Sequence, residues 1–479
     1  MIVIAKKLRF DEADAKALVG LVGTCAAFDG AAYLEEEKSL NAFKDMATVF
    51  LAEEGGALIG ALSVFAPKME EAEIGALVDP LHRRRGIFTA LLERAEEELL
   101  RFGYLDELFV VDGGSAAGKA VAAGLGASLG FTEYAMRHSR DPGGPKAPRG
   151  KALPELELKR VGIEAIEELV ALRGAEFGDT REEALSFERA TFAAPNREVL
   201  CAFAEGRMVG ACTVGYEGSR AEINGLVVSR KEQGKGYGQA IVGILVDRLS
   251  AKGLEILLDV DSVNANALHI YRKAGFVPTM AKDYWRRRLP GGNAALLLRE
   301  LRDYRLSHPG EEEIADRISA FVSTRPDAFS RSCLEGHVTG SAFVCDPGLS
   351  RALFVEHAKL GRLLQPGGHC EAGESAREAA AREALEETGL APAAWPGLGI
   401  FDIDVHEIPA RGEVPAHSHY DIRYLFTAEA GGERVSEESS SVEWLGFDEA
   451  RSRNPAASIR RPLAKIEALR GRGRGGRLA

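Results

Sequence analysis

The sequence predicts a multidomain α/β protein, and three observations support this fold class. The chain has 479 residues, enough for roughly three domains of ~150 residues each. Its apolar content of 46% and charged content of 28% are ordinary for globular proteins. One plan of strand, basic loop and helix occurs twice, at residues 72–100 and 221–249, and a third helix is flanked by strand-like runs after residue 340.

The composition of the chain limits which binding partners and which cellular compartment we expect for the protein. The net charge of −12 argues against a general surface for DNA or for membranes. Six cysteines are scattered without a C-x-x-C pair, which fits a reducing compartment and offers no cysteine-based zinc site. No apolar run is long enough to span a bilayer, and the first residues lack a signal-peptide pattern. We therefore expect a cytoplasmic protein with neither a DNA nor a membrane partner.

The repeated plan defines the first two predicted domains, residues 1–140 and 156–290. Gly60 and Gly210 occupy equivalent places 150 positions apart. A period of this length indicates duplicated domains rather than a solenoid. Residues 141–155 are rich in Pro, Gly and Lys and are predicted to be a linker.

The second copy has a glycine-rich loop between a strand that ends at Val228 and the following helix. The loop residues are Gln233, Gly234, Lys235, Gly236, Tyr237 and Gly238. Glycines there let backbone N–H groups approach a pyrophosphate, and the helix N-terminus adds partial positive charge. For such a hexamer taken alone, a plain turn is the alternative.

Residues around this loop extend the pattern. Glu222 lies on the preceding strand, and the positions that follow the loop are Asn264, Ala267, Tyr271, Gly275 and Phe276. Together they resemble the GNAT N-acetyltransferase family, over nearly all of residues 156–290. The resemblance implies that Val228, the loop and Asn264 bind acetyl-CoA, and that an acetyl group passes to a small-molecule amine. Tyr271 is then the candidate acid, because a phenol of pKa near 10 suits a departing thiolate. Glu222 is the candidate base, directly or through water, with an exposed strand residue as the open alternative.

The first copy departs from the family pattern. Its loop contains Arg83, Arg85 and Gly86, through which it could still bind acetyl-CoA. Counting back from Phe131, Gly126 takes the place of the tyrosine and Lys119 that of the asparagine. It resembles the degenerate half of tandem acetyltransferases, so we favour a scaffold or cofactor-only role. A competent variant with Glu73 as its base stays open.

The third region is organised around Gly368 to Leu390. Ser375 followed by Glu378 is a capping-box helix start, and Gly389 is a helix stop. The residues between them are mostly good helix formers.

Three glutamates of this helix, Glu383, Glu386 and Glu387, are predicted to lie on one face. Like charges at this spacing cost roughly 0.2–0.5 kcal/mol. Carboxylates in the last turn face the negative end of the helix dipole, for about 0.3–1 kcal/mol more. A hard cation such as Mg²⁺ would reverse both effects. The alternative is a solvated helix in which Arg382 screens Glu378 and Glu386.

The spacing is similar to the Nudix box, Gly-x5-Glu-x7-Arg-Glu-U-x-Glu-Glu-x-Gly-U, where U is apolar. The matching residues are Gly368, Glu374, Arg382, Glu383, Glu386, Glu387, Gly389 and Leu390. The resemblance implies an α/β/α sandwich over residues 300–479 that hydrolyses a nucleotide diphosphate derivative with Mg²⁺ or Mn²⁺. The three glutamates after Arg382 would hold the metal and carry the catalysis. Gly368, Glu374, Arg382 and Gly389 would support the box, Glu374 and Arg382 also having a potential part in metal or base chemistry.

Histidines are further candidates in this region. His417, His419 and Asp421 could face the substrate, as could His337, His369 and His406. A His-x-His pair could bind a metal, but with no third ligand placed we favour ordinary polar strand residues.

Two stretches have weaker signals. Asn293–Arg305 is predicted to be a strand or a connector, and residues 460–479, basic and rich in Gly toward the end, a frayed solvated tail.

The resemblances together imply a bifunctional enzyme. One alternative is an acetyltransferase regulated by a Nudix domain that binds a nucleotide without turnover, against which the intact set of carboxylates argues. Another is an acetyltransferase-like scaffold that never transfers an acetyl group.

Overall fold

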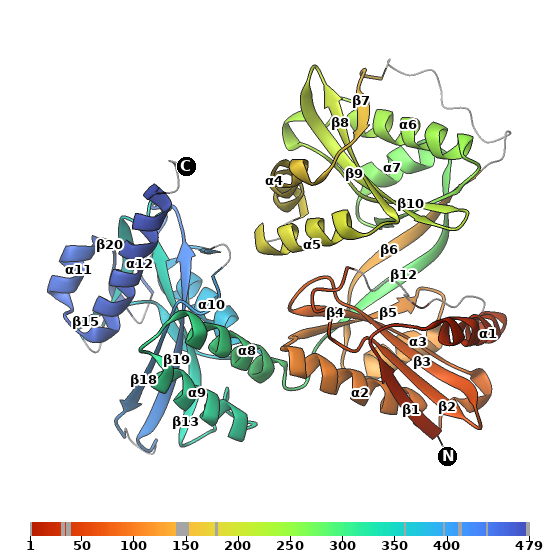
Figure 1. Ribbon diagram of the computed structural model, residues 1–479. Coiled ribbons are helices and arrows are strands. Elements are labelled where there is room, and N and C mark those ends of the chain that lie inside the picture. Colours follow the sequence, from red (N-terminus) through yellow and green to blue (C-terminus); the bar gives the residue numbers. More distant parts are fainter. Residues whose placement is uncertain are drawn as a thin grey trace. The chain divides into compact units, whose positions relative to one another are not determined.

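The computed structural model describes residues 2–29, 34, 40–139, 153–177, 181–358, 361–395, 398–410, 414–436 and 439–475. The chain forms two compact units, Met1–Leu289 and Pro290–Ala479 (Figure 1). The predicted linker lies largely outside the described residues. Among the described residues, every helix is too short or too polar to span a bilayer.

A twelve-stranded sheet runs through the first unit. Its strands, in sheet order, are β1 (Ile2–Lys7), β2 (Val49–Glu54), β3 (Ala57–Phe65), β4 (Glu71–Val78), β5 (Asp106–Asp112), β12 (Phe276–Arg288), β6 (Ser128–His138), β11 (Glu255–Asp261), β10 (Arg220–Val228), β9 (Arg207–Glu217), β8 (Arg197–Ala204) and β7 (Glu157–Arg160). β2–β3 and β8–β9 are hairpins, whose turns contain the positive-φ glycines Gly55 and Gly56 and Gly206.

Helices cover both faces of this sheet in each repeat. In the first repeat they are α1 (Glu12–Asp29), α2 (Ile87–Phe102) and α3 (Ala116–Gly124). In the second they are α4 (Ile166–Phe177), α5 (Arg181–Ala193), α6 (Tyr237–Ala251) and α7 (Ala265–Lys273). One core of the second repeat packs under α6 and α7, and a smaller one packs under α4 and α5.

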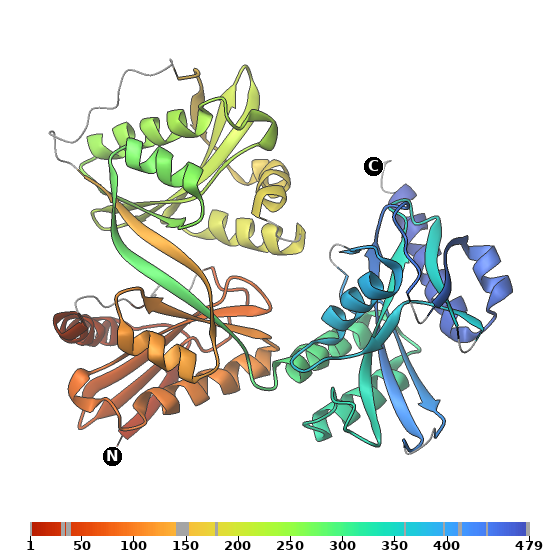
Figure 2. The ribbon, with the colours of Figure 1, turned by 180° about the vertical axis from the view of Figure 1, so that it is seen from behind.

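The last strand of each repeat completes the sheet of the other. β12 of the second repeat pairs antiparallel with β5 of the first, and β6 of the first pairs antiparallel with β11 of the second. β6 and β12 also pair with each other, side by side, as Figures 1 and 2 show. The repeats follow one another along the sequence but share strands in space. Sequence periodicity does not reveal this exchange, because both strands keep their order along the chain.

The second unit is an α/β/α sandwich, as the third region of the sequence predicted. Its sheet has the central order β15 (Arg362–Leu364), β14 (Arg351–His357), β13 (Gly336–Cys345), β19 (His417–Thr427) and β17 (Ala393–Ala394). Three further strands pair with these: β16 (Gly367–His369) with β13, β18 (Asp402–Ile408) with β19, and β20 (Ser439–Gly446) with β14. One face packs against α8 (Gly292–Ser307), α9 (Glu312–Thr324) and α10 (Ala376–Thr388), and the other against α11 (Phe447–Arg453) and α12 (Ala457–Gly475).

Two predictions for this unit are wrong. Asn293–Arg305 is neither strand nor connector but lies in α8, whose Leu297 and Leu301 are buried in the core. The predicted solvated tail forms most of α12, whose apolar residues Ile459, Leu463 and Ile466 are buried at helical spacing.

The start of α12 is tied to the sheet by polar contacts. Pro462 lies inside the helix and cannot donate to the Ser458 carbonyl one turn before it. Arg423 from β19 donates to that carbonyl instead, at 3.1 Å. Arg423 also bonds Asp421 at 2.7 Å and Asp402 at 3.0 Å, so its buried charge is compensated.

Candidate active sites

In the second repeat, two neighbouring parallel strands separate. β10 and β11 pair from Arg220 to Ile223, after which each continues without the other. A bulge between Asn224 and Val227 bends β10, and Gly225 there has a positive φ of 57°. Bulges are frequent beside active sites because they redirect side chains and end strand pairing. The pairing of the two strands therefore ends one residue after Glu222, which leaves an opening in the sheet there.

Glu222 and Tyr271 lie on opposite faces of the sheet at this opening. Ala221 and Ile223 belong to the core under α6 and α7, together with Tyr271. Because side chains alternate along a strand, Glu222 points to the other face, where it is exposed. Tyr271 is 7% exposed, and burial raises its pKa to about 12. The phenol thus keeps its proton at neutral pH, as an acid must before it acts.

The glycine-rich loop leads directly into α6. Gly234 and Gly236 have positive φ angles of 75° and 94°, which few other residues adopt without strain. Gln233 donates from Nε2 to the Val228 carbonyl at 3.0 Å and fixes the loop to the end of β10. The helix begins at Tyr237 with no side-chain cap, so its first N–H groups are available to an anion.

Other predicted binding residues have structural contacts of their own. Lys235 forms an ion pair with Glu232 at 2.8 Å. Asn264 caps α7, its side chain accepting from Ala267 N at 3.0 Å. A Cβ added to Gly238 would lie 3.3 Å from Ile270, so a small residue there lets α6 and α7 pack closely.

In the second unit, the Nudix-like segment has the predicted helix signals. Ser375 and Glu378 form a complete capping box at the start of α10, and Gly389 ends it with φ 74°. Gly340 lets α10 approach β13, since an added Cβ would lie 2.1 Å from the Ala376 carbonyl. The helix is thereby held against the middle of the sheet.

Arg382 joins the carboxylates of this segment. It holds Glu374 through two hydrogen bonds of 2.9 Å, which connects the loop to the helix. It also donates to Glu383 at 2.9 Å and Glu386 at 3.0 Å, and to the His369 carbonyl at 2.9 Å. One guanidinium therefore serves three carboxylates, and the cluster keeps excess negative charge. Of the two contacts that the solvated-helix alternative expected, the one between Arg382 and Glu386 is present, and Glu378 forms the capping box with Ser375.

The residues present fit a divalent cation. Burial raises the pKa of Glu383, although Arg382 opposes this, and the nearby Glu386 raises it further. A Cβ on Gly368 would lie 2.2 Å from Glu383, so only glycine leaves room for this carboxylate. Glu386 is exposed on the next turn, and Glu387 lies beside it along the helix. These hard oxygen donors are of the kind that Mg²⁺ and Mn²⁺ prefer.

Family models match both kinds of region. The model of the acetyltransferase (GNAT) family matches residues 22–126 and 164–276, and the model of the NUDIX domain matches residues 337–465. The chain contains two GNAT domains and a NUDIX domain.

Individual relatives fall into the same two classes. A mycothiol acetyltransferase of Clavibacter michiganensis subsp. michiganensis is 29% identical over 214 residues, 43% of this chain and 68% of that protein. The putative mutator protein MutT4 of Mycobacterium tuberculosis is 38% identical over 119 residues, 24% of this chain and 45% of that protein. The structure of a GCN5-related N-acetyltransferase from Sphaerobacter thermophilus aligns with 60% of this chain and over 96% of its own length. The sequence identity is 18% and the TM-score is 0.48.

The loop of the first GNAT domain is held by ion pairs. Arg83 donates to the Val78 carbonyl at 3.0 Å, the contact that Gln233 makes in the second domain. Arg83 is also paired with Asp29 at 2.6 Å, and Arg85 with Glu54 at 2.8 Å. A phosphate ligand would compete with these carboxylates for the arginines.

Helix caps correct the alignment of the two GNAT domains. Ser115 caps α3 as Asn264 caps α7, and the positive φ angles of Gly126 and Gly275 mark the same later turn. Both pairs are 149 residues apart, so Ala122, rather than Gly126, occupies the place of Tyr271. Likewise Ser115, rather than Lys119, corresponds to Asn264. The inference that the first domain lacks the tyrosine stands, with a different residue in its place.

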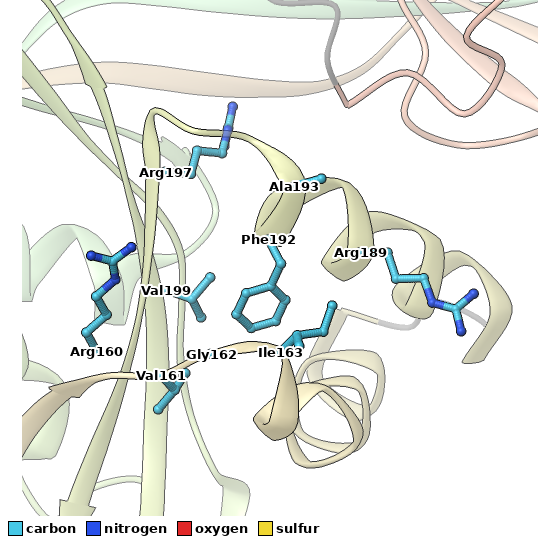
Figure 3. Close-up of a pocket in the computed structure, with 9 residues that line it drawn as sticks. All are labelled: Arg160, Val161, Gly162, Ile163, Arg189, Phe192, Ala193, Arg197 and Val199. Atoms are coloured by element: carbon cyan, nitrogen blue, oxygen red, sulfur yellow. The ribbon is translucent and has the colours of Figure 1, made fainter.

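The second GNAT domain also has a pocket of about 580 Å³ that the sequence did not predict (Figure 3). Phe192 of α5 points toward Val199 of β8 and Ile163, while Arg160 and Arg189 extend away on opposite sides (Figure 3). At its edge, Arg197 pairs with Gly215, which pairs with Glu222 on β10. The pocket therefore lies two strands away from the candidate base.

Five histidines come together at one end of the NUDIX sheet. They are His337 of β13, His369 of β16, His406 of β18, and His417 and His419 of β19. Burial and the neighbouring imidazoles lower the pKa of His369 to about 4 and that of His419 to about 3. Asp421, also a candidate from sequence, instead lies in the buried network of Arg423.

Arg331 is a residue that sequence reasoning missed. It is exposed, and its positive charge lowers the pKa of both His369 and Glu383. It precedes the box by 37 positions and belongs to no motif, so only the folded chain brings it near.

Proposed function

We propose that the protein is a bifunctional enzyme. Its second GNAT domain acetylates a small-molecule amine from acetyl-CoA. Its NUDIX domain hydrolyses a nucleotide diphosphate derivative with Mg²⁺ or Mn²⁺. The observation that carries the first activity is the pair Glu222 and Tyr271 at the opening of the sheet. The cluster of carboxylates around Arg382 carries the second.

In acetyl transfer, the two residues handle the two protons. Glu222, directly or through water, takes a proton from the amine, whose nitrogen then attacks the thioester carbon. The new C–N bond forms as the C–S bond breaks, and the electron pair of that bond leaves with sulfur. Tyr271 gives its proton to the thiolate. Burial raises the pKa of Tyr271 to about 12, so the hydroxyl is protonated at neutral pH, as a general acid must be, and the same shift makes it a weaker acid than a free phenol.

For acetyl-CoA, the loop from Gln233 to Gly238 is the proposed binding segment. Its left-handed glycines keep side chains away from the backbone, and the uncapped start of α6 offers N–H groups and partial positive charge to the pyrophosphate. Asn264 would act indirectly, since its side chain already caps α7.

For hydrolysis, Glu383, Glu386 and Glu387 are the proposed ligands of the metal, which when bound would neutralise phosphoryl charge and activate a water. Arg382 and Glu374 position these carboxylates through their hydrogen bonds. Arg331 is placed to attract a phosphate to the same region.

A panel of nucleotide diphosphate derivatives tests the NUDIX activity on the full chain. With Mg²⁺ we expect release of a phosphate-containing product. Glu386→Gln removes one oxygen ligand and should lower the rate roughly 100-fold or more, because metal ions stabilise such transition states by several kcal/mol. Glu313→Gln, at an exposed position of α9, is the matched control and should keep the wild-type rate.

Two outcomes would contradict this proposal. Tight nucleotide binding without turnover would favour a nucleotide sensor that regulates the acetyltransferase. Turnover that survives both Glu386→Gln and removal of Mg²⁺ would place the catalysis elsewhere.

A further inference from the structure

The histidines of the NUDIX domain converge because of strand register. His337 on β13 lies opposite His419 on the parallel neighbour β19, and His417 lies two residues before His419. Residues two apart on a strand share a face, so the three rings lie on one side of the sheet. Their ring centroids are 4.9 Å apart for His337 and His419, 5.1 Å for His337 and His417, and 5.3 Å for His417 and His419.

Several nitrogen atoms of this group are buried without partners. His337 is 4% exposed, and neither of its ring nitrogens makes a hydrogen bond within the described part of the chain. The same holds for Nε2 of His419. Buried polar atoms are nearly always satisfied, so these nitrogens call for a partner such as a water or a metal ion. Ring packing alone would not require histidine at these positions, since apolar rings would pack there without the penalty.

Carbonyl groups orient the rings as they do around bound metals. Nδ1 of His417 lies 2.9 Å from the Pro415 carbonyl, to which it can donate. This bond places the proton on Nδ1 and leaves a lone pair on Nε2. Burial lowers the pKa of His337, and the Cys333 carbonyl opposes this shift. Metal-binding histidines typically donate their second nitrogen to such a carbonyl.

We propose that His337, His417 and His419 bind a divalent transition-metal ion of the zinc class. One nitrogen from each lies within 4.8 Å of the others. Around a tetrahedral zinc with bonds of 2.0–2.1 Å the nitrogens stand roughly 3.3 Å apart. Imidazole nitrogens favour zinc, copper or nickel over Mg²⁺, which takes oxygen ligands.

The site is separate in chemistry from the carboxylate cluster and does not depend on the proposed hydrolysis. Three protein ligands leave a fourth position for water or for a donor from a bound molecule. The centroid of the His369 ring lies 4.8 Å from that of His337 and 5.1 Å from that of His419, so His369 is a candidate for the additional donor. His406 is not part of the set, because among the described residues the nitrogen atoms that lie within 4.8 Å of one another are those of His337, His417 and His419.

Cobalt binding to the full chain tests the proposal, with excess Mg²⁺ present to occupy carboxylates. We expect one equivalent of Co²⁺ to give the strong visible absorption of a four-coordinate nitrogen site, and Zn²⁺ to displace it. His419→Gln should weaken Co²⁺ affinity at least tenfold and lose the strong bands. His417→Gln, at a less buried position, should do the same and guards against a folding defect at His419. His406→Gln is the matched control and should keep the spectrum.

The proposal is overturned by either of two results. One is weak absorption typical of six-coordinate oxygen ligation in the wild-type protein. The other is a strong spectrum that survives His417→Gln and His419→Gln in variants whose unfolding midpoint without metal equals that of the wild type. A rise in that midpoint on adding Zn²⁺, present in the wild type and His406→Gln but absent in the other two variants, gives a second supporting readout.

Discussion

In the second GNAT domain, the strand that carries Glu222 is interrupted by a bulge, whereas the equivalent strand of the first domain runs without one. β10 changes register between Asn224 and Val227, while β4 pairs with β3 continuously from Glu73 to Val78. Glu73 nevertheless occupies the position of Glu222, because each is the third residue of its strand to pair with the next parallel strand. The first domain has kept the carboxylate but not the bent strand around it.

The loops that precede α2 and α6 also differ between the two domains. Gly234 of the second domain has φ 75°, and Arg84, 150 residues earlier, has φ 63°. Arginine in that region carries strain that glycine does not. Both loops still form the same hydrogen bond to the end of their strand, through Gln233 and Arg83.

The third difference lies under the helices. Tyr271 and Ala122 occupy equivalent places in the two cores, and only Tyr271 carries a hydroxyl. The comparison teaches that core positions and backbone bonds of the fold are shared by two domains that differ at the predicted catalytic positions. The following substitutions test this comparison between the two GNAT domains.

Loss of the tyrosine hydroxyl should have the largest effect. Tyr271→Phe keeps the buried ring and removes the proton donor, so acetyl transfer should slow by roughly 10²–10⁴-fold. Thiol release from acetyl-CoA against a panel of amines measures it. Tyr134→Phe, in the exchanged strand β6, is the control and should leave the rate unchanged. A Tyr271→Phe enzyme with nearly full activity would remove the main chemical distinction between the domains.

Giving the second loop the residue of the first should have an intermediate effect. Gly234→Arg forces a left-handed arginine and should cost about 1–2 kcal/mol of stability. It should also weaken acetyl-CoA binding roughly tenfold, equivalent to 1.4 kcal/mol. Denaturant unfolding and titration calorimetry measure the two effects.

Gly243→Arg is the control for that change, because Gly243 lies in α6 without a positive φ and an added Cβ there meets nothing within 4 Å. Unaltered affinity in Gly234→Arg would mean that the loop does not contact the cofactor.

The reverse change in the first domain should have the smallest effect. Arg84→Gly relieves left-handed strain but adds freedom to the unfolded chain, for a net gain of about 0.5–1 kcal/mol. Urea unfolding measures the gain. Arg94→Gly, in the exposed middle of α2, should instead destabilise by about 1 kcal/mol. If both variants lose stability equally, Arg84 is not strained.

Local signals in the sequence predicted much of this structure. The capping box at Ser375, the stop at Gly389 and the glycine-rich loop before α6 each act within a few residues, so their outcome could be anticipated. The apolar run in α8 was misread because a short run fits a strand or a buried helix equally well. In α12, the helical spacing of Ile459, Leu463 and Ile466 was present but hidden by the basic, glycine-rich surroundings.

Nonlocal pairing accounts for the rest. His337 meets His419 across 82 positions only because β13 and β19 pair in parallel. Equivalent residues of the two repeats are 150 positions apart early in the domain and 149 positions apart later. The caps of α3 and α7 reveal this change. Counting from a single landmark, Phe131, could not detect that shift.

The crossing of β6 and β12 makes the acetyltransferase half a tethered version of a domain-swapped dimer. Each half supplies an inner strand to its twin, through 10 paired positions between β6 and β12 themselves. If a protease cut the chain between the repeats, we expect the two fragments to stay associated through the paired strands β6 and β12. If either repeat were expressed by itself, it would lack the strand that the other repeat supplies and would expose a long strand edge. Such edges promote aggregation. The covalent tether thus keeps each repeat next to the one that completes its sheet, whatever the chemical role of the first copy.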